Sequence, residues 1–325
     1  MRWSRWKRKI LLIVLVSSLT VSGAAAILRF STPKPVVEPG LPAVVMESPA
    51  PALVSSNVPT ETPAVAPTPT TAPANIDPQF AQAAAQNAEL RNNLTWTFGG
   101  KQQRGWYLYV PLIRRLIGTE SSPDSAEFAF ALSRWQRGVG LPANGVLDNA
   151  TLSVMITTWQ SRRIKTKEYP SPDQLVMIPT TDLYDPQRPE ELRKAEGQAF
   201  AAYKRMMAAA IADKSLKLST DKTGELAASE KFLKVVSAFR SREYQEQLRR
   251  QSPNAGSAGL AVNSPHFTGR ALDLYVGGDP VSTEDSNRAI QVQTPVYLWL
   301  VKNAEAFGFR PYFYEPWHWE YVPSG

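Results

Sequence analysis

The stretch Ser-Pro-His-Phe-Thr-Gly-Arg-Ala-Leu-Asp-Leu-Tyr, residues 264–275, contains the strongest fold signal in this chain of 325 residues. Gly269 permits the backbone to turn, and residues 271–276 have the character of a short strand. The turn allows Asp273, seven residues after His266, to come back toward the histidine. We therefore expect a loop and a strand that present an imidazole and a carboxylate to one point.

The only other histidine, His318, lies in the sequence Glu-Pro-Trp-His-Trp-Glu-Tyr, residues 315–321. A catalytic zinc ion takes three protein ligands and keeps one position open for water. Because the chain has no cysteine, the third ligand has to be Asp or Glu, and Asp273 is the economical choice. We expect His266, Asp273 and His318 to hold zinc, to which imidazole and carboxylate ligands are well suited. Either histidine alone would be interpreted as an ordinary polar residue, but the two motifs together are more specific.

The acid three residues before the second histidine suggests hydrolytic chemistry. Zinc lowers the pKa of its water to about 7, and a nearby carboxylate such as Glu315 can then pass the proton to a leaving amine. Arg240 can stabilise the negative charge that develops at an attacked carbonyl, or it can be a structural partner of an acid. Trp317 and Trp319 are candidates for a wall of the pocket, with one of the two expected to belong to the core. A glycosidase with paired carboxylates would leave both histidines unexplained.

The last 160 residues, 166–325, mix helix and strand patterns. We expect helices over residues 189–212, 241–250 and 296–307, and strands over residues 232–239, 271–276 and 317–322. The elements do not follow regular βαβ spacing, which favours an α+β domain with a small antiparallel sheet flanked by helices.

The first 30 residues have the features of an export signal or a membrane anchor. They contain six positive charges and no acid, and residues 10–28 form an uncharged run. The alanines at 24–26 fit a cleavage site, whereas the length of 19 residues is near the limit for spanning a bilayer and favours an anchor. Either reading predicts an extracytoplasmic protein, membrane-anchored or secreted. Only +1 of the net charge of +7 remains for the rest of the chain, which argues against nucleic-acid binding.

Residues 31–80 hold 12 of the 27 prolines and are expected to be an extended linker. Residues 81–165 then have a globular composition. We expect a short hairpin or an aromatic-rich loop over residues 94–109, followed by helices over residues 128–138 and 149–159.

Residues 131–152 resemble the small three-helix peptidoglycan-binding domain that is appended to wall hydrolases. The resemblance rests on four pairs: Trp135-Gln136, Gly140-Leu141, Asn144-Gly145 and Thr151-Leu152. It implies that residues 81–165 direct the chain to the cell wall, although such modules can also be structural spacers.

From about Tyr169 to Gly325 the chain resembles the VanY-type D-alanyl-D-alanine carboxypeptidases, a family of zinc metallopeptidases. Both family signatures, Ser-x-His-x-x-Gly-x-Ala-x-Asp and Glu-x-x-His, are complete at residues 264–273 and 315–318. Residues 237–245, Ser-Ala-Phe-Arg-Ser-Arg-Glu-Tyr-Gln, are similar to the family element Ser-Gly-Tyr-Arg-Ser-x-x-x-Gln.

The resemblance implies hydrolysis of the C-terminal D-alanine from peptidoglycan stem peptides. Arg240 would then stabilise the substrate carbonyl or its oxyanion, and Gln245 and Ser264 would hold the terminal carboxylate. The same site could serve an L,D-carboxypeptidase or a peptidoglycan endopeptidase, and the chain could also be a non-catalytic, zinc-containing wall-binding protein. Three departures from the family pattern concern substrate preference. Glu320 stands where many relatives have a basic residue, and Phe267 stands where a polar residue is common. Ala238-Phe239 replaces the more usual pair Gly-Tyr.

Overall fold

The computed structural model describes residues 77–252 and 260–323, all of which belong to one compact unit, residues 63–325. The predicted signal or anchor, residues 1–30, and nearly all of the predicted linker lie outside the described residues. Among the residues that are described, no helix has the length and apolar character needed to cross a bilayer.

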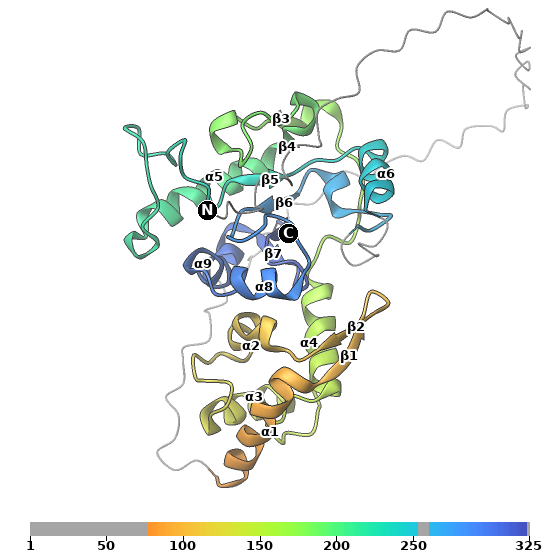
Figure 1. Cartoon of the computed structure of the whole chain (residues 1–325), viewed down its shortest axis with the longest axis vertical. Coiled ribbons are helices and arrows are strands. Elements are labelled where there is room, and N and C mark those ends of the chain that lie inside the picture. Colours follow the sequence, from red (N-terminus) through yellow and green to blue (C-terminus); the bar gives the residue numbers. More distant parts are fainter. Residues whose placement is uncertain (1–76, 253–259, 324–325) are drawn as a thin grey trace, which may run out of the picture. The chain divides into compact units, whose positions relative to one another are not determined.

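The first part of this unit, up to about residue 165, is mainly helical (Figure 1). It contains α1 Gln79–Asn93, the hairpin strands β1 Thr95–Phe98 and β2 Lys101–Arg104, the 3₁₀ turn Tyr107–Tyr109, α2 Val110–Ile117, α3 Ala126–Gly138 and α4 Asn149–Ser161. The hairpin is the first of the two alternatives expected for residues 94–109. The described residues of this segment form four α-helices, one more than the expected three, because Pro111 at the start of α2 and left-handed Gly118 at its end delimit a further short helix.

The residues that carry the resemblance to a peptidoglycan-binding domain have a clear structural task. The side chain of Gln136, at the end of α3, accepts from the Gly145 amide at 2.8 Å and donates to Thr151 Oγ1 at 3.0 Å. Asn144 Oδ1 accepts from the amide of Val146 at 2.9 Å. These bonds fix the turn between α3 and α4, so the motif is explained here by local packing, and its wall-targeting role stays a prediction.

The second part of the unit is α+β, as predicted. A four-stranded antiparallel sheet has the order β5-β6-β8-β7, and Figure 1 shows its strands in the middle of this part with helices around them. The strands are β5 Val235–Ser237, β6 Ala271–Leu274, β7 Phe309–Pro311 and β8 His318–Tyr321, and β3 Leu175–Met177 and β4 Lys194–Glu196 form a separate pair. The α-helices are α5 Gly197–Ala212, α6 Arg242–Gln251, α8 Asp285–Gln291 and α9 Pro295–Asn303. Short 3₁₀ helices are Pro172–Gln174, Thr180–Asp182, Glu190–Leu192, Lys214–Leu216, Pro265–Thr268 and Ala304–Phe307.

One predicted helix begins later than expected. The prediction started it at residue 189, but α5 begins at Gly197, because residues 194–196 pair with β3 as strand β4. Glu196 then caps the helix by accepting from the Ala199 amide at 2.8 Å. The first turn attributed to the helix, Glu190–Leu192, is a separate 3₁₀ turn.

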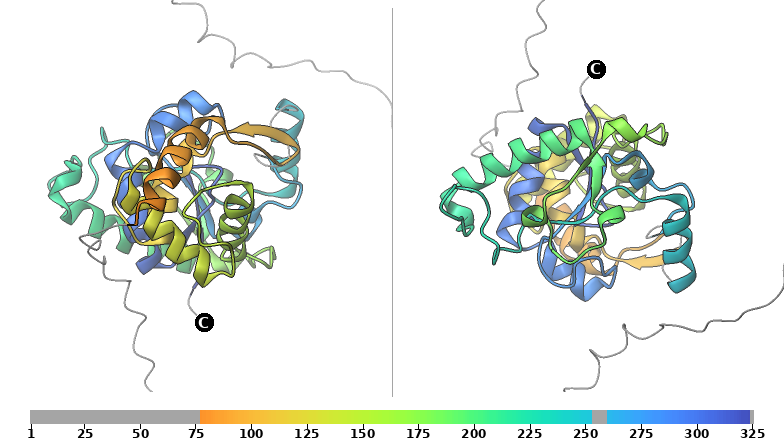
Figure 2. Two further views of the ribbon diagram at one scale, coloured as in Figure 1. Left: turned by 90° about the horizontal axis from the view of Figure 1, so that it is seen from below. Right: turned by 90° about the horizontal axis from the view of Figure 1, so that it is seen from above.

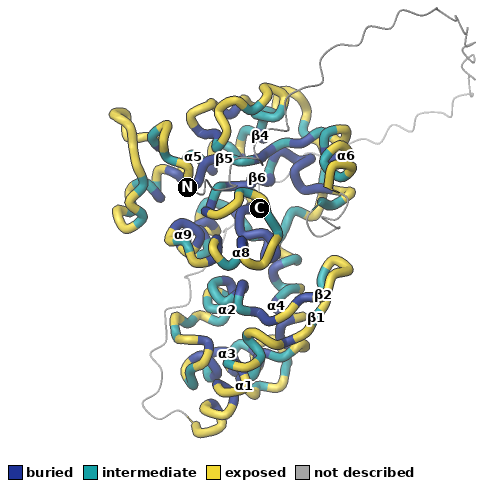
Figure 3. Tube along the Cα trace, in the orientation of Figure 1, coloured by how far each residue is buried: buried dark blue, intermediate teal, exposed yellow. Residues whose placement is uncertain are grey.

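The helical segment and the α+β part share a hydrophobic core. Trp159 of α4 stacks on Phe313 with ring centroids 5.8 Å apart, and Phe98 of β1 meets the same ring edge-on at 4.7 Å. Figure 3 shows β5 and β6 buried, whereas the tip of the β1–β2 hairpin is exposed. Both views in Figure 2 show this hairpin reaching toward α6. Residues 81–165 therefore contact the α+β part closely, and the boundary near residue 165 stays a prediction.

Candidate active site

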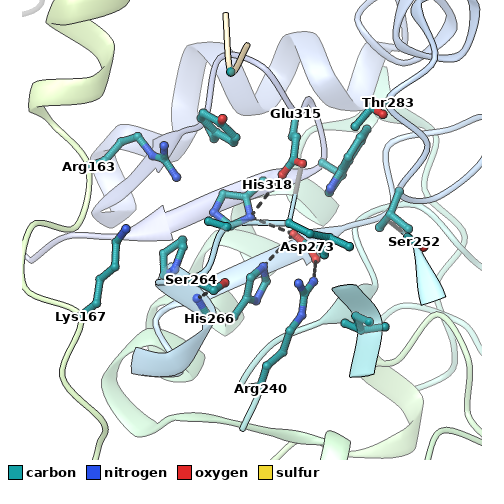
Figure 4. A pocket seen from close by; sticks show the side chains of 18 of the residues that line it. Arg163, Lys167, Arg240, Ser252, Ser264, His266, Asp273, Thr283, Glu315 and His318 are labelled. Atoms are coloured by element: carbon teal, nitrogen blue, oxygen red, sulfur yellow. Dashed lines mark hydrogen bonds and ion pairs between the residues drawn. The ribbon is translucent and has the colours of Figure 1, made fainter. Parts of the chain in front are cut away.

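A pocket of about 450 Å³ contains the predicted metal ligands on its wall. Arg240, Ser264, His266, Asp273, Glu315, Trp317 and His318 all line it, as do Phe98, Gly99, Gln160, Arg163 and Lys167 from the first half of the described chain. Figure 4 shows both imidazole rings facing the Asp273 carboxylate, with Glu315 on one side and Arg240 on the other. Residues from both sequence segments thus form one pocket.

Strand pairing brings two of the three proposed ligands together. Asp273 of β6 and His318 of β8 are direct partners in the antiparallel register, and the Asp273 Oδ1 to His318 Nδ1 distance is 3.0 Å. His266 comes from the 3₁₀ turn before β6, and its Nε2 lies 3.3 Å from the same carboxylate oxygen. One ligand atom from each of the three residues lies within 4.8 Å of the others, and all three side chains are buried. The predicted cluster is therefore present and could hold a metal ion.

Gly269 makes this turn possible. Its φ is +66°, and a Cβ atom there would lie 2.8 Å from the backbone nitrogen of Glu196. Any other residue would strain the backbone and also collide with β4. Ser264 begins the turn, with its Oγ accepting from the His266 amide at 3.3 Å. The loop-and-strand arrangement predicted from residues 264–275 is confirmed.

Hydrogen bonds orient both imidazole rings. The Nδ1–H of His266 donates to the carbonyl oxygen of Ala238 at 2.6 Å, which leaves Nε2 as the nitrogen that faces Asp273. His318 is turned the other way: its Nε2 donates to Glu320 Oε1 at 3.1 Å, and Nδ1 faces Asp273. An imidazole whose far nitrogen is engaged in this manner is held in one tautomer with its other lone pair available to a metal. Two such nitrogens and one carboxylate form a donor set that zinc accepts.

The charges of the site are strongly perturbed. Burial, assisted by Arg240, lowers the pKa of His266 to about 4, so this ring is neutral at physiological pH. Burial acts to raise the pKa of Asp273, but His266 and Arg240 hold it well below its usual value. Burial would lower the pKa of His318, yet its hydrogen bonds to Asp273 and Glu320 raise it to about 9. Without a metal His318 is therefore protonated at neutral pH. A bound metal ion would displace the proton on Nδ1, which faces Asp273.

Glu315 is the predicted base. Its Oε2 lies 3.9 Å from His318 Nδ1, and burial raises its pKa to about 8. A turn holds it beside the ligand, because its amide donates to Tyr312 O at 3.1 Å and its carbonyl accepts from the His318 amide at 3.0 Å. A buried carboxyl group whose pKa lies near the pH at which an enzyme operates is suited to proton transfer.

Arg240 is bound more tightly within the protein than the resemblance implies. Its Nη2 forms an ion pair with Asp273 Oδ2 at 2.5 Å, and its Nε donates to Ser237 Oγ at 2.9 Å. Its Nη1 makes only a long contact of 3.4 Å with Gln245 Oε1. Gln245 itself is buried, donates to Ala261 O at 3.0 Å, and is not among the residues that line the pocket. The structure thus assigns Arg240 a structural partner as well as a pocket-facing position.

Two residues of the site's surroundings were not predicted. Arg163, just after α4, forms an ion pair with Glu320, and Lys167 donates from the pocket wall to Asn263 O at 2.8 Å. Arg163 and Glu320 are 157 positions apart, so no local spacing could have linked them. Glu320 had stood out in the sequence only because a basic residue is common at that position in relatives.

Comparison with known protein families gives a match in the second half of the chain. Residues 193–324 match the family described as D-alanyl-D-alanine carboxypeptidase, VanY, whereas no curated protein matches the chain. The matched range contains every predicted site residue but begins after Arg163 and Lys167. It leaves the resemblance of residues 131–152 to a peptidoglycan-binding domain a prediction. Residues 193–324, which carry both signatures and the buried cluster, thus match the family model of VanY, D-alanyl-D-alanine carboxypeptidase.

Proposed function

We propose that this protein is a zinc-dependent carboxypeptidase that removes the C-terminal D-alanine from peptidoglycan stem peptides. The observation that supports it best is the buried cluster of His266, Asp273 and His318 beside Glu315 on the wall of an open pocket. Carboxypeptidase-type activity at the level of the family accompanies the VanY match. The metal, the individual residue roles and the choice of D,D bond are our proposal.

The donor set supports zinc as the metal. His266 Nε2, His318 Nδ1 and the Asp273 carboxylate supply two nitrogens and one oxygen, the number of protein ligands that catalytic zinc sites use. When bound here, zinc would supply Lewis-acid activation of water and of the scissile carbonyl.

The side chains of the chain itself would do the remaining work. Glu315 takes a proton from the attacking water and gives it to the amine of the departing D-alanine. Arg240, through the weakly engaged Nη1, donates to the carbonyl oxygen as negative charge develops there. In this proposal Ser264, which lines the pocket, donates its hydroxyl proton to the terminal carboxylate, and Gln245 supports Arg240 through its contact with Nη1. Trp317 closes the pocket wall.

The location of the substrate agrees with the sequence-based expectation for the rest of the chain. An N-terminal export signal or anchor would place residues 81–325 outside the cytoplasm, where stem peptides are found. The helical segment, if it binds the wall, would keep the pocket near its substrate. Lys167 on the pocket wall supplies a positive charge that suits a peptide with free carboxylates.

Mass spectrometry of purified muropeptides incubated with the protein tests this proposal. We expect loss of one terminal alanine from pentapeptide stems, inhibition by a chelator, and recovery on addition of zinc. Glu315→Gln should lower the rate of hydrolysis by about 10²- to 10⁴-fold while zinc remains bound. Glu305→Gln is a matched control, because Glu305 is paired with Arg310 and does not line the pocket.

The substrate panel separates the alternatives. Cleavage only of tetrapeptide stems would make the protein an L,D-carboxypeptidase, and cleavage only of crosslinked dimers would make it an endopeptidase. Zinc binding without any change in a muropeptide would reject a catalytic role in favour of a zinc-containing wall-binding protein. Activity that survives complete removal of metal would reject the zinc mechanism.

A further inference from the structure

Glu320 is a buried carboxylate that contacts His318 on the side of the ring away from the other candidate metal ligands. It lies two residues after His318 on strand β8, so both side chains project from the same face of the sheet. Its side chain is fully buried, and Oε1 accepts from His318 Nε2 at 3.1 Å. The hydrogen bond holds the ring so that Nδ1, not Nε2, faces Asp273.

A buried carboxylate needs partners of its own, and those come from outside the matched family domain. Arg163 donates to Glu320 Oε1 from Nε at 3.0 Å and also from Nη2. The Ile164 amide donates to the other oxygen, Oε2, at 2.8 Å. Both carboxylate oxygens are therefore occupied by residues that immediately follow α4.

Arg163 is itself held rigidly. Its Nη1 donates to Gln160 Oε1 at 2.8 Å, and its guanidinium carbon lies 3.8 Å from the centre of the Tyr312 ring. Only 17% of its side chain is exposed. The geometry forms a continuous path from helix α4 through Arg163 and Glu320 to a metal ligand.

We propose that Arg163 and Glu320 are positioning residues of the metal centre: Glu320 fixes the His318 ring, and Arg163 fixes Glu320. The inference rests on the proposed metal-dependent function. It implies that residues 193–324 are incomplete as a metal site and that the helical segment has a part in metal binding as well as any part in wall targeting. Loss of a residue that hydrogen-bonds the far nitrogen of a metal-binding histidine typically weakens metal affinity by about 10- to 100-fold.

Zinc dissociation constants of purified full-length variants, measured by competition with a chromophoric chelator, test the proposal. We expect Glu320→Ala and Arg163→Ala each to weaken zinc binding by about 10- to 100-fold. Arg310→Ala is the matched control. Arg310 lies opposite Glu320 in the β7–β8 register, is in an ion pair with Glu305 at 3.0 Å and is 21% exposed, but among the described residues its side chain forms no hydrogen bond or ion pair with Glu320 or His318. Its zinc affinity should stay within about twofold of the parent.

Two further measurements separate positioning from mere loss of packing. Because Arg163 acts through Glu320, the double variant should bind zinc about as weakly as Glu320→Ala alone, whereas independent effects would multiply. The visible spectrum of the cobalt-substituted protein should change in both single variants and not in Arg310→Ala. Should an alanine variant fail to fold, Arg163→Lys and Glu320→Gln replace it, with smaller losses of affinity in the same order.

Parent-like zinc affinity and an unchanged cobalt spectrum in folded Arg163 and Glu320 variants would overturn the inference and leave the ion pair a structural anchor. That result would leave the proposed carboxypeptidase function intact. Failure of the parent protein to bind zinc would instead reject the proposed function itself, so the two failures are distinguishable.

Discussion

Glu315→Gln is expected to change activity and stability in opposite directions. Loss of a general base typically lowers the rate by about 10²- to 10⁴-fold, and we expect kcat/KM to fall by that amount. The stability effect concerns the metal-free protein, in which burial raises the pKa of Glu315 from 4.5 to about 8. A pKa raised on folding contributes stability below pH 4.5 that is lost as the pH rises toward 8.

The size of this loss follows from the pKa difference. Each pH unit between 4.5 and the working pH corresponds to about 1.4 kcal/mol, which gives up to about 3 kcal/mol at pH 7. Glutamine has nearly the same shape and no charge, so Glu315→Gln removes the penalty. We expect the metal-free variant to be more stable than the parent by up to about 3 kcal/mol at pH 7, or roughly 6 to 12 °C in Tm.

Thermal unfolding in the presence of a chelator, at pH 4.5, 7 and 8, measures this difference. The Tm of the two proteins should converge at pH 4.5 and separate progressively above it, with the variant higher. Lower stability of the variant at pH 7, or a difference that does not depend on pH, would refute the reasoning about burial. Turnover within tenfold of the parent would refute the assignment of Glu315 as the base.

Three further predictions concern the same site. Hydrogen bonds to two carboxylates raise the pKa of His318 to about 9, so zinc binding at pH 7.5 should release at least one proton, measured by calorimetry in buffers of different ionisation enthalpy; zero release would contradict the metal-free charge state. Arg240→Ala leaves Asp273 Oδ2 buried without its ion-pair partner, and urea denaturation should show a loss of roughly 3–5 kcal/mol, whereas a loss below about 1 kcal/mol would count against that pair. Gly269→Ala should lower the unfolding free energy by roughly 1–3 kcal/mol and weaken zinc binding, whereas Gly224→Ala, which also has positive φ but open space around it, should cost less and leave zinc affinity unchanged.

The helix and strand patterns were predicted well where local signals are strong. Ser241 begins α6 as an N-cap, and Asp148 does the same for α4, because short polar side chains satisfy the free amides of the first turn. The predicted start of α5 was wrong because a contact with a distant strand overrides the local helix pattern. Residues 194–196 suit a helix, but pairing with β3 satisfies their backbone groups as a strand.

Among the site residues, the sequence by itself determined those that depend on short spacing. His266 and Asp273 are joined by a turn at Gly269, and Glu315 and His318 by a turn of four residues, so local backbone geometry brings each pair together. Because a zinc site with two histidines and one carboxylate needs ligands from both pairs, the two pairs were expected to lie close together in the fold.

Only the tertiary structure decided how those pairs meet and what surrounds them. The β6–β8 pairing sets Asp273 beside His318 across 45 residues, and the contact between Arg163 and Glu320 spans 157. No local sequence pattern predicts such contacts, since they depend on how whole helices and strands pack against each other. The sequence by itself therefore determined the residues of the candidate metal cluster, whereas the contacts of Glu320 that orient His318 became visible only with the helical segment packed against the sheet.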